Sequence, residues 1–126
     1  MSRLGYDPTA APKRATEADC QRTIIEAARL AGWLVHHTRP AQMQSGKWAT
    51  PLQGDPGFVD LVLCHPARGL LWFVELKRKP NKATAAQQQW MFALADVSDD
   101  ISVQFVWVPD ELDAFIARLV SPLEKT

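Results

Sequence analysis

The sequence predicts an α/β fold in which a small mixed β-sheet is flanked by helices, in the order α-β-β-β-α-β-α. Segments whose apolar residues recur at helical spacing alternate with short, strongly apolar runs. The two central runs are apolar on both faces, as expected of strands covered by helices on both sides. With 126 residues and 14.1 kDa, the chain fits one compact domain over residues 16–126, behind a flexible N-terminal arm of residues 1–15.

The first helix is predicted to begin after Thr16, which forms a capping box with Asp19, and to end at Gly32. Residues 33–38 form a short strand, and residues 39–57, rich in Pro, Gly and Gln, form a loop too long to be a simple connection. The apolar positions at helical spacing within this helix are Cys20, Ile24, Ala27, Ala28 and Ala31.

The remaining elements start with two apolar strands, residues 58–64 and 70–77, joined by a hairpin turn over residues 65–69. Thr84 caps a second helix, with Gln87 at its third position. A fourth strand covers residues 101–108, and Asp110 caps a last helix. The apolar stripe of that last helix is Leu112, Phe115, Ile116 and Leu119.

Composition excludes several classes of protein. Apolar residues make up 47% and charged residues 22%, which is typical of a globular protein, and zero net charge excludes a uniformly basic, histone-like binder. No apolar run reaches about 18 residues and no signal peptide is present, so we expect no membrane span and a cytoplasmic location. Cys20 and Cys64 match no metal-ligand spacing and are interpreted as small buried hydrophobes in a reducing compartment.

The charges are segregated along the chain. Four basic residues fall within six positions, and the segment 94–113 contains six acids and no Lys or Arg. This pattern predicts one positive end of the fold and one negative end; an ordinary solvated surface with uneven sampling is the alternative. The basic residues are Lys77, Arg78, Lys79 and Lys82, and the acids are Asp96, Asp99, Asp100, Asp110, Glu111 and Asp113.

Acidic residues occur at one end of the central hairpin. Glu75 and Lys77 share a face because side chains alternate along a strand, and Asp60 lies near the start of the preceding strand. If the hairpin turns symmetrically about Ala67, Asp60 lies opposite Val74, and a single bulge would bring the two acids level. Two carboxylates and an ammonium group are thus delivered to the same end of a buried hairpin.

Buried carboxylates that repel each other are costly unless a cation neutralises them. Carboxylates together with carbonyls and waters suit Mg²⁺ or Mn²⁺, and Lys77 would then lie where it can polarise the nucleophile or offset charge on a phosphate. The alternative is a purely structural salt bridge of Lys77 with Asp60 or Glu75. The residues alone leave both open.

Other polar residues have equally open interpretations. Gln87 begins the core-facing stripe of the second helix and can orient a water or phosphate at the site, or it can act only as a capping-box residue. Glu17 can contact the site, or it can be favoured in a first helical turn by the helix dipole alone. His36 and His37 face opposite sides of a strand and cannot ligate one ion together, and His65 is expected at the surface, away from the acids.

The order of these residues resembles the PD-(D/E)XK nuclease superfamily, and within it the VRR-NUC family, particularly its short stand-alone members from phages and prophages. The resemblance covers residues 16–120, and Val59 replaces the proline usual before the motif Asp. The similar stretches are Thr16-Glu17 with Gln21, residues 50–57, Gly57-Phe58-Val59-Asp60-Leu61-Val62-Leu63, Glu75-Leu76-Lys77 and Thr84-Ala85-Ala86-Gln87-Gln88-Gln89-Trp90.

The resemblance implies a nuclease core that hydrolyses DNA phosphodiesters with Mg²⁺ or Mn²⁺. The implied metal ligands are Asp60, Glu75 and the Leu76 carbonyl, with Glu17 as an additional contact, directly or through water. Lys77 is the implied catalytic lysine. The implied catalytic set is Asp60, Glu75, Lys77 and Gln87.

The functional hypothesis is therefore a metal-dependent DNA endonuclease selective for branched or junction DNA, acting as a homodimer so that two sites cut two strands. Sequence-neutral phosphate contacts would suit recognition of DNA shape. A non-catalytic DNA-binding or scaffold module with the nuclease fold is the main alternative, and a sequence-specific restriction-type endonuclease is a third. The phosphate contacts are assigned to Arg39, Lys47, Arg78, Lys79 and Lys82.

Overall fold

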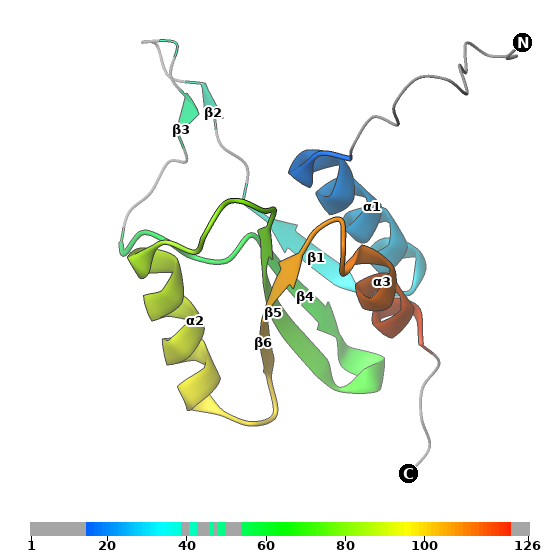
Figure 1. Cartoon of the computed structure of the whole chain (residues 1–126). Helices are drawn as coiled ribbons and strands as arrows, with labels where there is room; N and C mark the ends of the chain where they lie inside the picture. The colour runs from blue at the N-terminus through cyan, green and yellow to red at the C-terminus, as the bar shows by residue number, and fades with distance from the viewer. Residues whose placement is uncertain (1–14, 39–40, 43–45, 47, 50–53, 122–126) are drawn as a thin grey trace, which may run out of the picture.

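The computed structural model describes residues 15–38, 41–42, 46, 48–49 and 54–121, and these form a small mixed α/β domain (Figure 1). The helices are α1 (Glu17–Leu30), α2 (Ala85–Val97) and α3 (Leu112–Val120), with a short 3₁₀ turn, η2 (Pro66–Arg68). The main sheet has the strand order β1-β4-β5-β6, with β1 (Leu34–His37), β4 (Leu61–His65), β5 (Leu70–Lys77) and β6 (Ser102–Trp107). The predicted order of elements in the main sheet and its helices is confirmed.

The predicted loop over residues 39–57 contains an element that the sequence did not indicate. Strands β2 (Ala41–Gln42) and β3 (Trp48–Ala49) pair as a separate antiparallel ladder. The predicted N-terminal arm lies outside the described residues except for Ala15, which packs against the core.

Helices cover both faces of the sheet, as the apolar central strands predict. In Figure 1, α1 and α3 lie together on one side, where they also contact each other, and α2 lies on the opposite side. Strands β4 and β5 form an antiparallel hairpin, and β6 runs parallel to β5 after the crossover through α2. Because β5 and β6 are parallel, their carboxyl ends meet at the same edge of the sheet.

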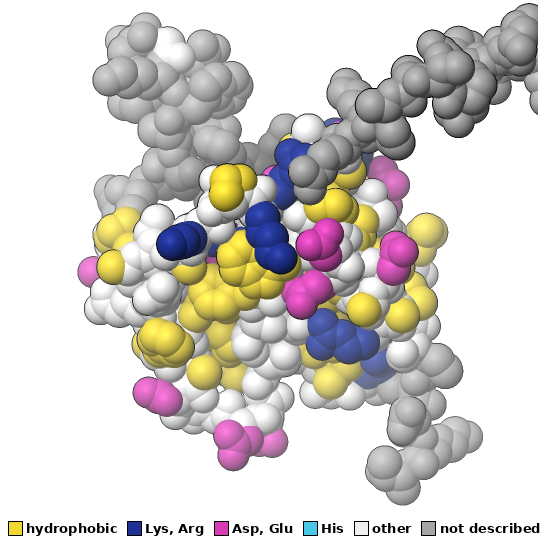
Figure 2. Space-filling view, in the orientation of Figure 1, with side chains coloured by type: hydrophobic (Ala, Val, Ile, Leu, Met, Phe, Trp, Pro, Cys, Tyr) yellow, Lys and Arg dark blue, Asp and Glu magenta, His cyan; other side chains and the backbone are white. Residues whose placement is uncertain are grey.

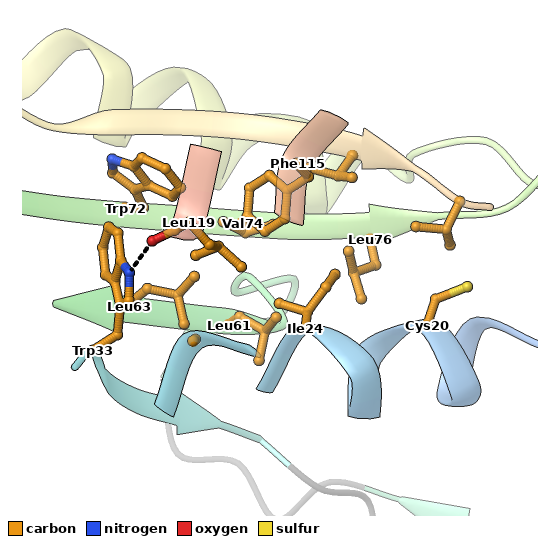
Figure 3. Close-up of a cluster of buried hydrophobic side chains, with 13 residues drawn as sticks. Cys20, Ile24, Trp33, Leu61, Leu63, Trp72, Val74, Leu76, Phe115 and Leu119 are labelled. Atoms are coloured by element: carbon orange, nitrogen blue, oxygen red, sulfur yellow. Dashed lines mark hydrogen bonds between the residues drawn. The ribbon is translucent and has the colours of Figure 1, made fainter. Parts of the chain in front are cut away.

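The main core lies between the sheet and the α1–α3 layer (Figure 3). Ile24 from α1, Leu61 from β4 and Phe115 from α3 are fully buried there, and each contributes about 1.5–3 kcal/mol through removal of apolar surface from water. The indole of Trp33 donates a 2.9 Å hydrogen bond to the Leu119 carbonyl, which fixes the end of α3. The apolar stripe predicted for α3 is confirmed.

The two cysteines are free thiols, of which Cys20 is buried and Cys64 half-buried. The interpretation as a buried hydrophobe therefore holds fully only for Cys20.

Helix starts follow the sequence signals at two of three positions. The capping boxes of Thr16 with Asp19 and of Thr84 with Gln87 are both formed. The predicted cap of α3 by Asp110 is wrong: the N-cap position is Glu111, with no side-chain cap hydrogen bond. The Glu111 carboxylate instead accepts a 2.8 Å hydrogen bond from the Trp107 backbone N–H, so it terminates β6 and does not cap the helix.

The hairpin register differs by one residue from the prediction. Leu61 pairs with Val74, so continuing the ladder by one pair places Asp60 opposite Glu75 and no bulge is needed. The cause is the turn, in which the 3₁₀ segment ends at Gly69 with φ 66°, a left-handed conformation that shifts the centre of the hairpin by half a residue.

His65, expected at the surface, is half-buried and structural. Its Nδ1 accepts from the Arg68 backbone N–H at 3.3 Å, so Nε2 carries the proton and donates to the Ala31 carbonyl at 2.9 Å. The ring also packs edge-on against Trp33. This histidine therefore ties the hairpin turn to the end of α1.

The predicted charge segregation is only partly correct. Figure 2 shows acidic side chains at the lower tip of this face, where α2 leads into β6, and basic side chains over its upper part. However, β6 returns to the carboxyl end of β5, and this brings Asp110 to within 4.0 Å of Lys79. One group of acids thus lies at the basic end. In the part of the chain that the structure describes, no helix is long and apolar enough to cross a membrane.

Candidate active site

Asp60 lies at the entry to β4, held by backbone contacts on both sides. Val59 before it and Leu61 after it are buried, so the chain is fixed where the carboxylate projects. Its Oδ2 accepts a 2.8 Å hydrogen bond from the Leu76 backbone N–H on β5. This bond ties the start of one central strand to the end of the other and brings Asp60 beside Glu75.

Glu75 is buried, with 3% of its surface exposed, at the carboxyl end of β5. Its Oε2 accepts a 3.0 Å hydrogen bond from the Gln87 amide and lies 3.8 Å from the Lys77 ammonium nitrogen. Its Oε1 is buried without a hydrogen-bond donor. A buried carboxylate oxygen without a donor is costly, so this atom is where the site is incomplete.

Without a bound cation, the ionised forms of Asp60 and Glu75 are disfavoured, and the pKa of each carboxyl group is raised. Burial, followed by the negative charge of Asp60, raises the pKa of Glu75 to about 8. Burial also raises the pKa of Asp60, and the hydrogen bond from Leu76 opposes this rise. Without a cation the pair therefore tends to retain a proton between its oxygens.

Lys77 is buried, with 8% of its surface exposed, whereas Asp60 is half-buried. The structural salt bridge considered for this lysine is present with Glu75, at 3.8 Å. One ammonium group cannot balance two carboxylates, however, and the charges of Asp60, Glu75 and Lys77 sum to −1 when all three are ionised. The salt bridge therefore leaves the need for a further positive charge unmet.

Gln87 forms the predicted capping box and also contacts the site through Glu75, while its predicted role toward a water or phosphate stays a prediction. Its Oε1 accepts a 2.9 Å hydrogen bond from the Thr84 backbone N–H, completing the capping box, and its Nε2 donates to Glu75. The amide therefore connects the first turn of α2 to the acid on β5, and it orients Glu75 through a side chain whose own position is fixed by the helix start.

A close contact between a loop and α2 positions Asp60, and sequence reasoning assigned it no role. Gly57 has φ 92°, and a Cβ there would lie 2.5 Å from the Ala86 backbone carbon. Phe58 packs edge-on against Trp90 with ring centroids 4.9 Å apart, and the Trp90 indole donates to the Asp55 carbonyl at 3.3 Å. The sequence feature that could have indicated this contact was Gly57, the glycine directly before the apolar strand.

Glu17 faces the site from the first turn of α1. Burial, and next the charge of Asp60, raise its pKa, whereas Lys77 and Arg78 lower it. Glu17 therefore lies in the first helical turn, where the helix dipole favours an acid, and it also lies close enough to the other acids for their charge to act on it. Among the described residues, no group of three or more His, Cys, Asp or Glu side chains is placed to hold a metal ion, so Glu17 is not assembled with the other two acids as a ligand set.

The predicted phosphate-binding residues are only partly described. Arg78 is half-buried, with its Nε buried and without a hydrogen-bond partner. Lys79 and Lys82 are exposed. Arg39 and Lys47 lie outside the described residues.

His37 also lies near the site, although the sequence indicated no role for it there. His37 pairs with Leu61 across the β1–β4 ladder, and its charge contributes to lowering the pKa of Asp60. It therefore lies beside Asp60, whereas His36 next to it is exposed. The position of His37 depends on how the edge strand β1 pairs with β4, and no sequence pattern indicated that register.

The residues present fit a hard divalent cation. Mg²⁺ is commonly bound through one or two carboxylates, with waters and substrate phosphates as its other ligands. The donor set of Asp60 and Glu75 satisfies this, and the unpaired Glu75 Oε1 is an available ligand atom. No family model, curated protein or solved structure matches the chain.

Proposed function

We propose that this protein is a Mg²⁺- or Mn²⁺-dependent DNA endonuclease that hydrolyses phosphodiester bonds. The observation that supports it most is the buried pair of Asp60 and Glu75, which carries net negative charge beside Lys77 and has a carboxylate oxygen without a donor. The resemblance of the sequence motif to PD-(D/E)XK nucleases supports the same chemistry.

In this proposal Asp60, Glu75 and the Leu76 carbonyl hold the cation. When bound, the cation supplies Lewis-acid polarisation of the phosphate and lowers the pKa of water. The hydrogen bond from the Leu76 N–H keeps Asp60 in place. The hydrogen bond from Gln87 restricts rotation of the Glu75 carboxylate.

Lys77 contributes a fixed positive charge. The ammonium group is held at 3.8 Å from Glu75 in a largely water-excluded position, where its effect on charge developing on a phosphate oxygen is stronger than in bulk water. Arg78, next in the chain, adds a guanidinium group with a buried donor that lacks a partner. A phosphate bound beside the acids would accept a hydrogen bond from the Arg78 Nε–H group.

The substrate class in this proposal is branched or junction DNA. The basic residues near the site are suited to phosphates and carry no direct base readout. A homodimer is also part of the proposal, because two copies would place one active site on each of two DNA strands. Sedimentation of the free protein and of its DNA complex measures how many copies associate.

The test is a cleavage panel of four-way junction, flap, nicked and single-stranded DNA with Mg²⁺ or Mn²⁺. We expect cleavage of at least one branched substrate, loss of cleavage on addition of EDTA, and no cleavage by Lys77→Ala. Lys79→Ala is the comparison variant, because it removes an exposed lysine assigned to phosphate contact and leaves the buried charges intact; it should weaken DNA binding but retain cleavage at saturating DNA. DNA binding without cleavage under all metal conditions would instead favour the non-catalytic module.

A further inference from the structure

We infer that the groove between α1 and the edge strand β1 binds the sugar-phosphate backbone of the DNA strand that leads away from the cleavage site. This inference rests on the proposed function and assigns a surface whose two arginines are not among the motif residues. The groove has a volume of about 670 Å³. Its polar lining residues are Gln21, Arg22, Glu26, Arg29, His36 and His37.

The groove lies next to the site described above. His37, which lines it, pairs with Leu61, the residue that follows Asp60. Ala18, at its other wall, follows Glu17 in the first turn of α1. The groove therefore has one end beside residues that neighbour the acids, and it extends along α1 to Arg29 in the last turn of the helix.

The two arginines have the spacing of a phosphate track. Arg22 and Arg29 are seven residues apart, which places them on the same face of α1 and about 10.5 Å apart along its axis. That distance spans about three nucleotides of one DNA strand at roughly 3.4 Å each. Arg22 and Arg29, on one face of α1 beside β1, can therefore contact phosphates of a single DNA strand.

The charge of the groove favours an anion. Two guanidinium groups and one carboxylate, that of Glu26, line the groove. Arg22 is also 3.5 Å from Asp19, but both side chains are largely exposed and an exposed pair of this kind is worth little. Arg22 can therefore contact a phosphate at small cost.

The test uses the Lys77→Ala background, so that DNA is bound without being cut. Binding of fluorescent junction and single-stranded DNA is measured by anisotropy at several salt concentrations. Replacing both Arg22 and Arg29 with Gln should weaken binding about five- to tenfold near 0.1 M salt and should lower the salt slope by about 1.4–1.8, because two phosphate contacts are lost.

A charge-matched pair of variants separates a groove contact from a general change in charge. Glu26→Gln and Asp99→Asn each remove one negative charge, the first inside the groove and the second at the α2–β6 turn. We expect tighter binding, by about two- to fivefold, only for Glu26→Gln. Circular dichroism confirms that each variant is folded.

Equal affinities for the double arginine variant and its parent would overturn the inference, as would equal gains from the two acid variants. Cleavage by the wild-type protein is measured separately on the same DNA. If the wild type cuts DNA while the arginine variants bind normally, the groove assignment fails and the proposed function stands. If the wild type neither binds nor cuts DNA, both fail.

Discussion

Replacing Glu75 with Gln should make the metal-free protein more stable while it abolishes cleavage. The carboxylate is buried beside Asp60, and its pKa rises from the ordinary 4.5 to about 8. A raised pKa in an acid means that the folded state binds more protons than the unfolded state between these values. The free energy of unfolding of the wild type therefore falls as the pH rises from about 5 to 8.

The size of this effect follows from the pKa shift. One pKa unit corresponds to about 1.4 kcal/mol, so the whole shift sets an upper bound of roughly 4–5 kcal/mol. The substitution also removes the ion pair of Glu75 with Lys77, which offsets part of this bound, and we expect a gain of about 1–2 kcal/mol for Glu75→Gln at pH 8. The amide keeps the shape of the side chain and can donate to Asp60, so a gap is not created.

The assay is thermal and urea unfolding of both proteins in EDTA at pH 5 and pH 8. For a domain of this size the expected gain raises Tm by about 5–10 °C at pH 8 and by much less at pH 5. Glu26→Gln, an exposed acid on α1, is the control and should change stability by less than about 0.5 kcal/mol. A destabilised Glu75→Gln protein at pH 8, or a gain independent of pH, would refute the electrostatic reasoning.

Three further predictions test the site. Mn²⁺ should raise Tm at pH 8 more than at pH 5.5, because binding requires deprotonated carboxylates, and Asp60→Asn should lose the effect; equal shifts in both proteins would place the ion elsewhere. Gln87→Ala should cost about 1–3 kcal/mol by urea unfolding, since two hydrogen bonds are lost, whereas exposed Gln89→Ala should cost little. Gly57→Ala should destabilise the fold by about 1–3 kcal/mol more than Gly54→Ala, because both have positive φ but only Gly57 has Ala86 in the way; equal costs would contradict the role of this contact.

Local signals in the sequence predict much of this fold. The capping threonines Thr16 and Thr84 define both helix starts correctly, because a hydroxyl, an Asp or Gln three residues on and an apolar run satisfy the orphan N–H groups in only one way. The stripe of α3 and the burial of the central strands were equally predictable, since they depend on periodicity alone.

Features that depend on contacts distant in sequence were not predictable. The register of the hairpin differed by one residue because the left-handed Gly69 changed the turn, and a symmetric turn was the simplest assumption. The position of Asp110 beside Lys79 depends on β6 returning parallel to β5. The placement of His37 next to Asp60 depends in turn on which strand pairs with β4.

The site itself was partly predictable because it violates the pattern around it. An apolar strand that ends in Glu-Leu-Lys places charge where burial is expected, and such departures concentrate at functional sites. Sequence alone identified Asp60, Glu75 and Lys77 as neighbours but left two readings of Gln87 open. The structure shows that the capping role leaves the amide nitrogen available to the site, because the Gln87 oxygen caps α2 and its nitrogen donates to Glu75, a contact that the sequence did not indicate.

The distinction between a structural ion pair and a cation site depends on the balance of charge at the sheet end. A structural pair would match each carboxylate with a cation, since an unmatched buried charge costs several kcal/mol. Here Lys77 lies 3.8 Å from Glu75, while His37 acts on Asp60 and Arg78 on Glu17, and Glu75 Oε1 has no hydrogen-bond partner. Burial nevertheless raises the pKa of Glu75 to about 8, so the neighbouring cations do not fully stabilise its ionised form. The protein alone can relieve this only by retaining a proton, and a divalent cation would relieve it more completely. In the proposed function, a divalent cation held at the junction of β4, β5 and α2 would allow both carboxylates to ionise.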